Sequence, residues 1–156
     1  MRLVLIAAVQ LVLLSESYSQ NVINFSKCGH VSFCFDCGDV KARYGNSLNI
    51  QSYLAKHLNP ESFQSLKGQL FVEVIIFING KACCRSITNI TNGSNREIEK
   101  LKIDKVIDDM PLWTPAVDKG ENQNSVVFLL LTLSEGIIRA EYKGVQISEP
   151  QNSLSK

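Results

Sequence analysis

The feature that most constrains the fold is a run of apolar and β-branched residues at positions 70–79 that ends in Asn79-Gly80. Side chains of a strand point alternately to its two faces, and in this run both faces are apolar. Asn and Gly tolerate the positive φ angles that a two-residue hairpin turn needs at both central positions. We therefore expect a strand over residues 70–79 and a second, antiparallel strand over residues 81–90.

Helical periodicity appears on both sides of this hairpin. Before it, apolar residues recur at three- and four-residue spacing over residues 47–58, and Asn59-Pro60 ends the stripe. Pro60 suits the start of a short helical turn, which Gly68 would close as a C-terminal cap. After the hairpin, a second apolar stripe covers residues 98–110 and ends at Pro111.

The last strong element is the apolar run at residues 126–133, which predicts a third strand with little solvent on either face. A turn sequence follows, and residues 137–142 indicate a weaker edge strand before a polar tail. The order of elements predicts an α+β domain in which two helices pack on a small antiparallel sheet of three strands, with room for a fourth at the edge.

The composition fits one globular domain with flanking segments. The chain has 156 residues, of which 45% are hydrophobic and 20% are charged, and its formal net charge is +1. Basic residues are interspersed with acidic ones, so the sequence predicts neither a nucleic-acid partner nor binding to membrane lipid.

The N-terminal segment has the layout of a secretory signal peptide, with a basic start, a short apolar run and small residues near Ser19. We expect cleavage after Ser19. This divides the chain into a signal peptide (1–19), a cysteine-rich arm (20–46), the domain (47–133) and an edge strand with a polar tail (134–156). The mature protein is then periplasmic or secreted. The alternative is a retained anchor, although the apolar run is shorter than the roughly 20 residues of a spanning helix.

Five cysteines follow this segment. Disulfides are the default in an exported protein, and an odd count leaves at least one thiol over. Neighbouring residues on a strand point to opposite faces, so we expect one of the adjacent pair Cys83 and Cys84 to face the core. The disulfide candidates are Cys28, Cys34, Cys37, Cys83 and Cys84.

Two other chemistries could use the same cluster. Cys28, His30, Cys34 and Cys37 are zinc-ligand types, although all four share one short segment and lack the two separated pairs of structural zinc sites. Cys34 and Cys37 also have thiol-redox spacing, but no helix follows them. Zinc binding and thiol redox are alternatives, and no cofactor is expected.

The sequence predicts no catalytic residues. Asp104, Asp108 and Asp109 could be taken for a carboxylate pair, but they lie largely on the polar side of the second helix, where charged residues normally face water. We therefore do not expect an enzyme. Matches to the Asn-x-Ser/Thr glycosylation pattern leave a eukaryotic secreted protein as a further alternative.

Several of these elements together resemble the C-terminal domain of TonB. In that family a proline precedes a short helix, a glycine opens a hairpin, and a helix ends in a Pro-x-Trp-x-Pro-Ala segment before the last strand. The resemblance covers about half of the chain, and its most specific part is residues 111–116. Trp113 is expected to fill the gap between helix and sheet. The matching residues are Pro60, Gly68, Gly80, Pro111, Trp113, Pro115 and Ala116.

The resemblance implies a domain that grips an extended segment of an outer-membrane receptor by adding it as a strand to a sheet edge. The matching edge consists of Val126, Val127, Phe128, Leu129, Leu130, Leu131, Thr132 and Leu133. The signal peptide is similar to those of Bacteroidetes.

A TonB transducer also needs a long proline-rich spacer, and this chain has four prolines. We therefore expect a free-standing periplasmic relative that binds an extended peptide or forms a homodimer. The alternative is a TonB energy transducer for outer-membrane transport, with a retained anchor.

Overall fold

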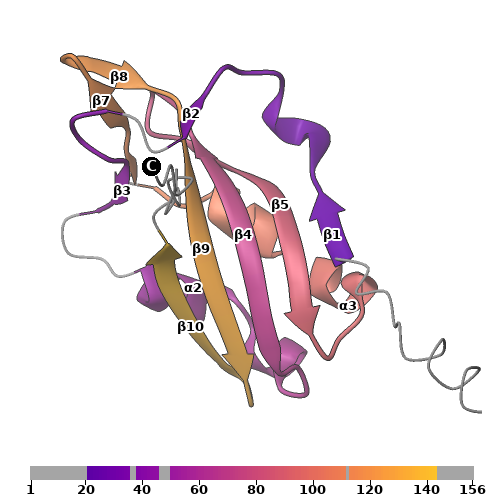
Figure 1. Ribbon diagram of the computed structural model, residues 1–156. Helices are drawn as coiled ribbons and strands as arrows, with labels where there is room; N and C mark the ends of the chain where they lie inside the picture. The colour runs from indigo at the N-terminus through magenta and orange to yellow at the C-terminus, as the bar shows by residue number, and fades with distance from the viewer. Residues whose placement is uncertain (1–20, 36–37, 46–49, 112, 144–156) are drawn as a thin grey trace, which may run out of the picture.

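The computed structural model describes residues 21–35, 38–45, 50–111 and 113–143 (Figure 1). The expected signal peptide, Cys37, the start of the helix expected from residue 47 and the polar tail lie outside these residues. The described part is an α+β fold with one mostly antiparallel sheet and a few helices, which confirms the predicted class. None of the described helices is long and apolar enough to cross a membrane.

One sheet organises the fold (Figure 1). Its main path runs β1-β5-β4-β9-β10, and the short β2 pairs with β9 beside this path. The pairing of β2 with β9 is parallel, whereas the other neighbours are antiparallel. The strands are β1 (Asn21–Asn24), β2 (Cys34–Phe35), β4 (Gly68–Ile76), β5 (Ala82–Thr91), β9 (Ser125–Ser134) and β10 (Ile137–Lys143).

The predicted sheet of three or four strands was too small, because the cysteine-rich arm adds β1 and β2. These strands span four and two residues, too few for a period-two pattern to be recognised. Contacts with the rest of the chain hold them. The Phe25 N–H, just after β1, donates to the Arg85 carbonyl at 2.8 Å, and a disulfide joins Cys28 to Cys83 on β5.

The turn between β4 and β5 differs from the predicted one. The Gly80 N–H donates to the Phe77 carbonyl at 2.8 Å, and of Asn79 and Gly80 only Gly80 has a positive φ, +77°. The connection is a turn over Ile78 and Asn79 followed by a left-handed glycine, so the predicted two-residue turn was wrong. A Cβ at position 80 would also lie 2.6 Å from the Trp113 carbonyl oxygen, so this close approach requires glycine.

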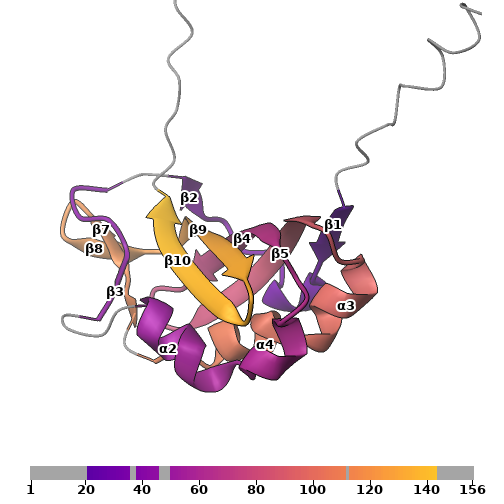
Figure 2. The ribbon, with the colours of Figure 1, turned by 90° about the horizontal axis from the view of Figure 1, so that it is seen from below.

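The helices lie on one face of the sheet (Figure 2). They are α2 (Ile50–His57), the 3-10 helix η2 (Pro60–Phe63), α3 (Asn95–Lys100) and α4 (Ile103–Asp108). The single helix predicted over residues 98–110 is two helices, because Lys102 adopts a left-handed φ of 57°. Residues two apart on one helix face different directions, and this break lets both Leu101 and Ile103 be buried.

The sequence suggested that Gly68 caps a helix, and this prediction was wrong. η2 ends at Phe63, and Gly68 is the first residue of β4 with a φ of +130°. A Cβ there would lie 2.5 Å from the Ile90 carbonyl oxygen on β5. The glycine therefore permits close strand pairing at the start of the hairpin.

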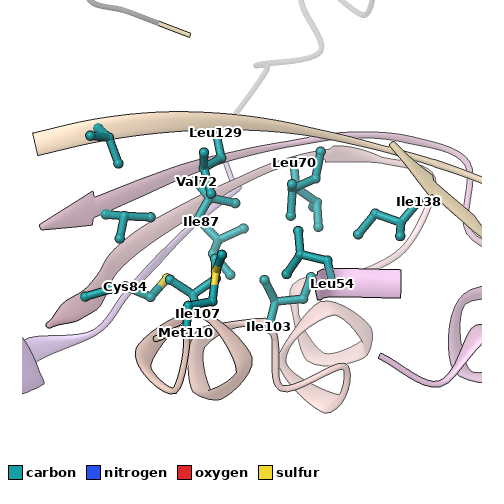
Figure 3. Close-up of a cluster of buried hydrophobic side chains, with 14 of the residues drawn as sticks. Leu54, Leu70, Val72, Cys84, Ile87, Ile103, Ile107, Met110, Leu129 and Ile138 are labelled. Carbon is teal, nitrogen blue, oxygen red and sulfur yellow. The ribbon is translucent and has the colours of Figure 1, made fainter. Parts of the chain in front are cut away.

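The main core lies between the helices and the sheet (Figure 3). Sheet and helices each contribute side chains to it that are almost entirely shielded from water. Burial of this kind contributes about 25 cal/mol per Å² of apolar surface, which makes it the main stabilising term of the fold. Residues drawn in Figure 3 include Leu54, Leu70, Val72, Ile87, Ile103, Ile107, Met110, Leu129 and Ile138.

A smaller apolar cluster lies on the opposite face of the sheet, beneath the arm. It contains Cys28, from the 3-10 helix η1 (Ser26–Cys28), together with Ile75, Cys83 and Val126. This cluster explains why β4 and β9 carry apolar residues on both faces.

The Trp113 segment packs against the end of the arm. Here β3 (Arg43–Tyr44) pairs with β6 (Trp113–Thr114), and β7 (Ala116–Asp118) pairs with β8 (Glu121–Gln123). Trp113 is buried in the main core, as expected, and its ring centroid lies 5.3 Å from that of Tyr44. Trp113 and Ala116 of the Pro-x-Trp-x-Pro-Ala segment thus belong to short strands and pack in the main core.

Candidate functional site

The predicted docking strand is β9. The prediction that it lies at a sheet edge was wrong. β4 pairs with one side of β9 over its whole length. On the other side, β10 pairs with Phe128–Ser134 and β2 pairs with Ser125 and Val126. Val127, Leu129, Leu131 and Leu133 are buried in the main core, and Phe128, Leu130 and Thr132 are half-buried.

The turn after β9 explains why its edge is occupied. Glu135 and Gly136 both have positive φ angles, 53° and 76°, as in a two-residue hairpin turn that returns the chain at once. β10 therefore lies directly beside β9 (Figure 1). An incoming strand would have to displace β10 to reach β9, so the accessible edge on this side of the sheet belongs to β10.

A groove of about 630 Å³ lies beside β10. This volume is within the usual range of small-ligand sites. Ala140 and Tyr142 of β10 form one wall, residues 39–44 form the other, and Ile50 at the start of α2 contributes to the lining. No strand among the described residues pairs with the outer side of β10.

The wall that residues 39–44 form is held by backbone hydrogen bonds to β7. Val40 and Val117 exchange two backbone hydrogen bonds, of 3.1 Å and 2.8 Å, so this part of the wall is tied to β7. At the groove, the Tyr142 hydroxyl donates to the Ala42 carbonyl at 3.0 Å. This hydrogen bond links β10 to the opposite wall.

Tyr44 also lines the groove, and it is 8% exposed. Its hydroxyl has no hydrogen-bond partner among the residues that the structure describes, an uncommon state for a buried polar group. Burial, and secondarily the neighbouring Tyr53, raise the pKa of Tyr44 above its usual value. The hydroxyl therefore stays protonated at neutral pH.

The groove was not predicted, although the sequence contains a signal for it. Residues 39–44 read Asp-Val-Lys-Ala-Arg-Tyr, an alternation of charged and apolar side chains that is typical of a half-buried strand. Its companion on β10, the alternation of Ile138, Ala140 and Tyr142, lies in the strand that the sequence did predict. What the sequence could not show is that the two segments face each other.

Three of the described cysteines are in disulfides. Cys28 is bonded to Cys83, and Cys34 is also disulfide-bonded. Sulfurs in disulfides are not thiolates, so Cys28 and Cys34 cannot act as the zinc ligands considered above, and His30 is exposed. These disulfides argue against the zinc alternative.

Cys84 is a free cysteine, buried in the main core, while its neighbour Cys83 lies in the cluster beneath the arm. The opposite orientation of the two is confirmed. Burial raises the pKa of the Cys84 thiol, and the nearby Asp108 raises it further. The thiol is thus a poor nucleophile. Cys34 begins a strand, whereas a reactive cysteine of a thiol-redox site begins a helix. Neither Cys84 nor Cys34 therefore fits a thiol-redox site.

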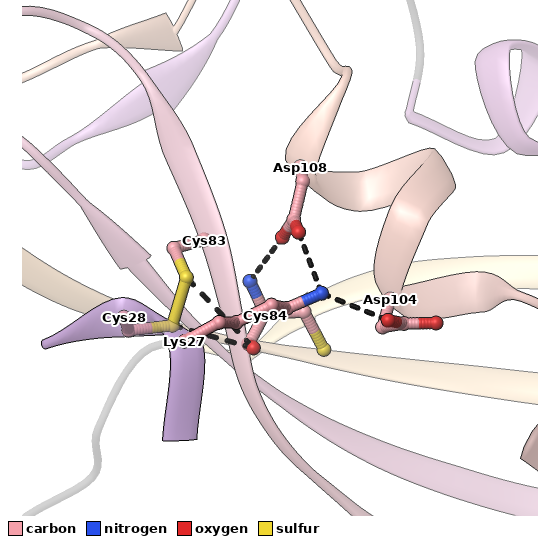
Figure 4. A network of polar contacts seen from close by, with 6 residues as sticks. All are labelled: Lys27, Cys28, Cys83, Cys84, Asp104 and Asp108. Carbon is pink, nitrogen blue, oxygen red and sulfur yellow. Dashed lines mark hydrogen bonds and ion pairs between the residues drawn. A yellow bond between two sulfur atoms is a disulfide. The ribbon is translucent and has the colours of Figure 1, made fainter. Parts of the chain in front are cut away.

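An ion-pair cluster ties the arm to α4 (Figure 4). Lys27 Nζ lies 2.8 Å from Asp104 Oδ2 and 2.6 Å from Asp108 Oδ2, and Asp108 Oδ1 accepts the Cys84 N–H at 2.7 Å. Burial alone would lower the pKa of Lys27, but its bonds to the two carboxylates outweigh this and raise it. Asp104 and Asp108 therefore hold the arm; the expectation that they face water was wrong.

Comparison with protein-family models, with curated proteins and with solved structures found no match. The candidate site therefore rests on the geometry of this chain.

Proposed function

We propose that this chain is a periplasmic or secreted binding module that takes up an extended segment of another protein as an added strand beside β10. The observation that carries the proposal is the groove of about 630 Å³ that Ala140 and Tyr142 of the seven-residue edge strand β10 border. Added strands gain affinity from main-chain hydrogen bonds and specificity from pockets for alternate side chains. The resemblance to the TonB C-terminal domain supports the same class of partner, including a segment of an outer-membrane receptor.

The groove offers both kinds of interaction. The outer side of β10 supplies main-chain donors and acceptors, and Ala140 and Tyr142 border space for side chains of the added strand. A second copy of the chain could pair by the same edge, so binding of a peptide and homodimer formation would compete.

Filling the groove tests this function. The variant Ala140→Phe places a large side chain in the groove, and the matched control Thr88→Phe makes the same bulky addition on β5, away from it. The probe is a fluorescent seven-residue peptide of alternating valine and threonine with blocked ends, the length of β10. Binding is followed by fluorescence anisotropy of the full mature chain, and folding by thermal unfolding of each variant.

We expect Ala140→Phe to weaken peptide binding by about tenfold or more, since an interface that loses about 1.4 kcal/mol loses a factor of ten in affinity. Thr88→Phe should bind as the unmodified protein does. Equal binding by both folded variants would place the interaction elsewhere, and absence of binding by the unmodified protein would contradict the proposal directly.

A further inference from the structure

The charged residues of β10 alternate in sign along one face of the strand. They are Arg139, Glu141 and Lys143, and all three are exposed. Ala140 and Tyr142, which line the groove, alternate with them, so the charged side chains lie on the other face of the sheet. An edge that carries both signs in alternation can match a copy of itself that runs in the opposite direction.

The turn before β10 determines which of its backbone groups point outward. Ser134 and Ile137 flank a two-residue turn, so this pair exchanges hydrogen bonds within the hairpin. The backbone groups of Ile137 therefore point toward β9. Because backbone direction alternates along a strand, those of Ile138, Ala140 and Tyr142 point away from it. A second strand can form hydrogen bonds only by placing its own outward-pointing residues opposite these three.

Two antiparallel copies of β10 overlap over all seven residues in one register, which places Ala140 of each copy opposite the other. In this register Ile138 lies opposite Tyr142 of the second copy, so all outward-pointing residues face one another. Arg139 lies opposite Glu141 of the second copy, and the same pair recurs on the other side of the two-fold axis. Both are non-hydrogen-bonded pairs, in which side chains across two strands lie closest.

The neighbouring registers lack this match. A shift by two residues places Arg139 opposite Arg139 in one direction, or Glu141 opposite Glu141 in the other, and like charges directly opposite each other are destabilising. Either shift also shortens the overlap. A shift by one residue places outward-pointing backbone groups opposite inward-pointing ones, so the strands cannot pair. Overlap, hydrogen bonding and charge therefore favour the same register.

Contacts within the chain leave these charges available. Among the described residues Arg139 forms no ion pair. Glu141 Oε2 lies 2.7 Å from Lys143 Nζ on the same strand, and the carboxylate keeps its negative charge in that contact. In the matched register Glu141 would lie between Lys143 of its own strand and Arg139 of the second copy.

We infer that, in the absence of another partner, the strand added beside β10 is β10 of a second copy, in a symmetric antiparallel dimer with Ala140 at its axis and two pairs of Arg139 with Glu141. This inference rests on the proposed function, because it names an occupant for the same edge. One seven-residue edge makes a small interface, so the dimer dissociates at low protein concentration and leaves the edge open to peptide.

Charge-swap variants test this register. Arg139→Glu places glutamate opposite Glu141, and Glu141→Arg places arginine opposite Arg139. Each change alone should weaken self-association of the full mature chain by about tenfold, because both symmetry-related pairs become like-charge pairs. Sedimentation equilibrium over a range of protein concentrations measures this, and thermal unfolding shows that each variant folds.

Mixing the two variants gives the sharper result. In a heterodimer of Arg139→Glu with Glu141→Arg every swapped charge meets its opposite, so the mixture should associate about as tightly as the unmodified protein. Arg96→Glu is the matched control. It makes the same change on α3, at the β1 side of the sheet (Figure 2), and should leave association unaltered.

The outcomes separate this inference from the proposed function. A chain that stays monomeric at every concentration but binds the valine–threonine peptide would overturn the dimer and leave strand addition intact. A dimer that neither variant weakens, or a mixture that associates no more tightly than its components, would overturn the register. Failure of the chain both to self-associate and to bind the peptide would overturn both proposals.

Discussion

Asp108 lies in the last turn of α4, where the helix dipole disfavours a negative charge. Its surroundings compensate for this position. One carboxylate oxygen contacts Lys27 Nζ, and the other accepts the N–H of Cys84, a residue with no exposed surface. Asp108 thus completes the hydrogen bonding of β5 at a point where no neighbouring strand does so.

Removing this carboxylate is expected to destabilise the protein. Asp108→Ala leaves the buried Cys84 N–H without an acceptor, which costs about 2 kcal/mol. Asp109→Ala is the matched control, because Asp109 is exposed at the same helix end. We expect its effect to stay within about 0.5 kcal/mol. Urea denaturation measures both, and equal losses would show that the Cys84 hydrogen bond contributes nothing.

Gly80 allows a second comparison between single residues. Gly80 and Gly120 have similar positive φ angles, 77° and 84°, but only at position 80 would a Cβ approach another atom closely, the Trp113 carbonyl oxygen at 2.6 Å. Gly120→Ala should cost about 1 kcal/mol for the left-handed backbone alone. Gly80→Ala should cost at least about 1 kcal/mol more. Thermal unfolding of the two variants measures the difference, and equal costs would mean that the Trp113 backbone moves aside freely.

At the scale of elements, the sequence was most informative where a pattern is long and local. The apolar runs at residues 70–79 and 126–133 predicted β4 and β9, and residues 137–142 predicted β10. The kink at Lys102 was not predictable, because it serves the burial of Leu101 and Ile103 against a sheet that local patterns do not contain.

The candidate site was less predictable than the fold for the same reason. The resemblance to the TonB C-terminal domain made β9 the expected edge, but strand order depends on which segments return beside it, and β10 and β2 both do. The groove unites residues 39–44 with Ala140 and Tyr142, about a hundred positions away. Each half has a visible alternation, and only the folded chain brings them together.

The arm is an element whose position depends on the disulfide between Cys28 and Cys83. This bond joins residues 55 positions apart, and closing a loop of that length stabilises the folded state by about 4 kcal/mol in the chain-entropy treatment. The double variant Cys28→Ser, Cys83→Ser should lose about this much stability in urea denaturation.

Hydrogen exchange adds a local measurement to that prediction. In the double variant the Phe25 amide, which bonds to the Arg85 carbonyl, should exchange faster relative to the central strand β4. Cys84→Ala is the control, since it removes a free sulfur and should cost about 1 kcal/mol. A double variant as stable as the unmodified chain would mean that the arm is held without the disulfide.

At the scale of the whole molecule, one face of the sheet carries the helices and part of the other carries the arm (Figure 2). The side of β9 away from β4 is occupied by β10 and β2. These arrangements leave the outer side of β10, next to the groove that Ala140 and Tyr142 border, as the site we propose for an added strand.

Hydrogen exchange of the β10 amides, measured by NMR with and without the seven-residue peptide of alternating valine and threonine, tests this proposal most directly. Backbone groups of an edge strand point alternately toward and away from the sheet. Strand addition should therefore slow the outward-pointing amides among residues 138–143, by about tenfold when free peptide is at ten times its dissociation constant. The amides of β1, at the other edge of the sheet, should be unaffected. Protection that appears on β1 instead, or binding without protection of β10, would contradict the account.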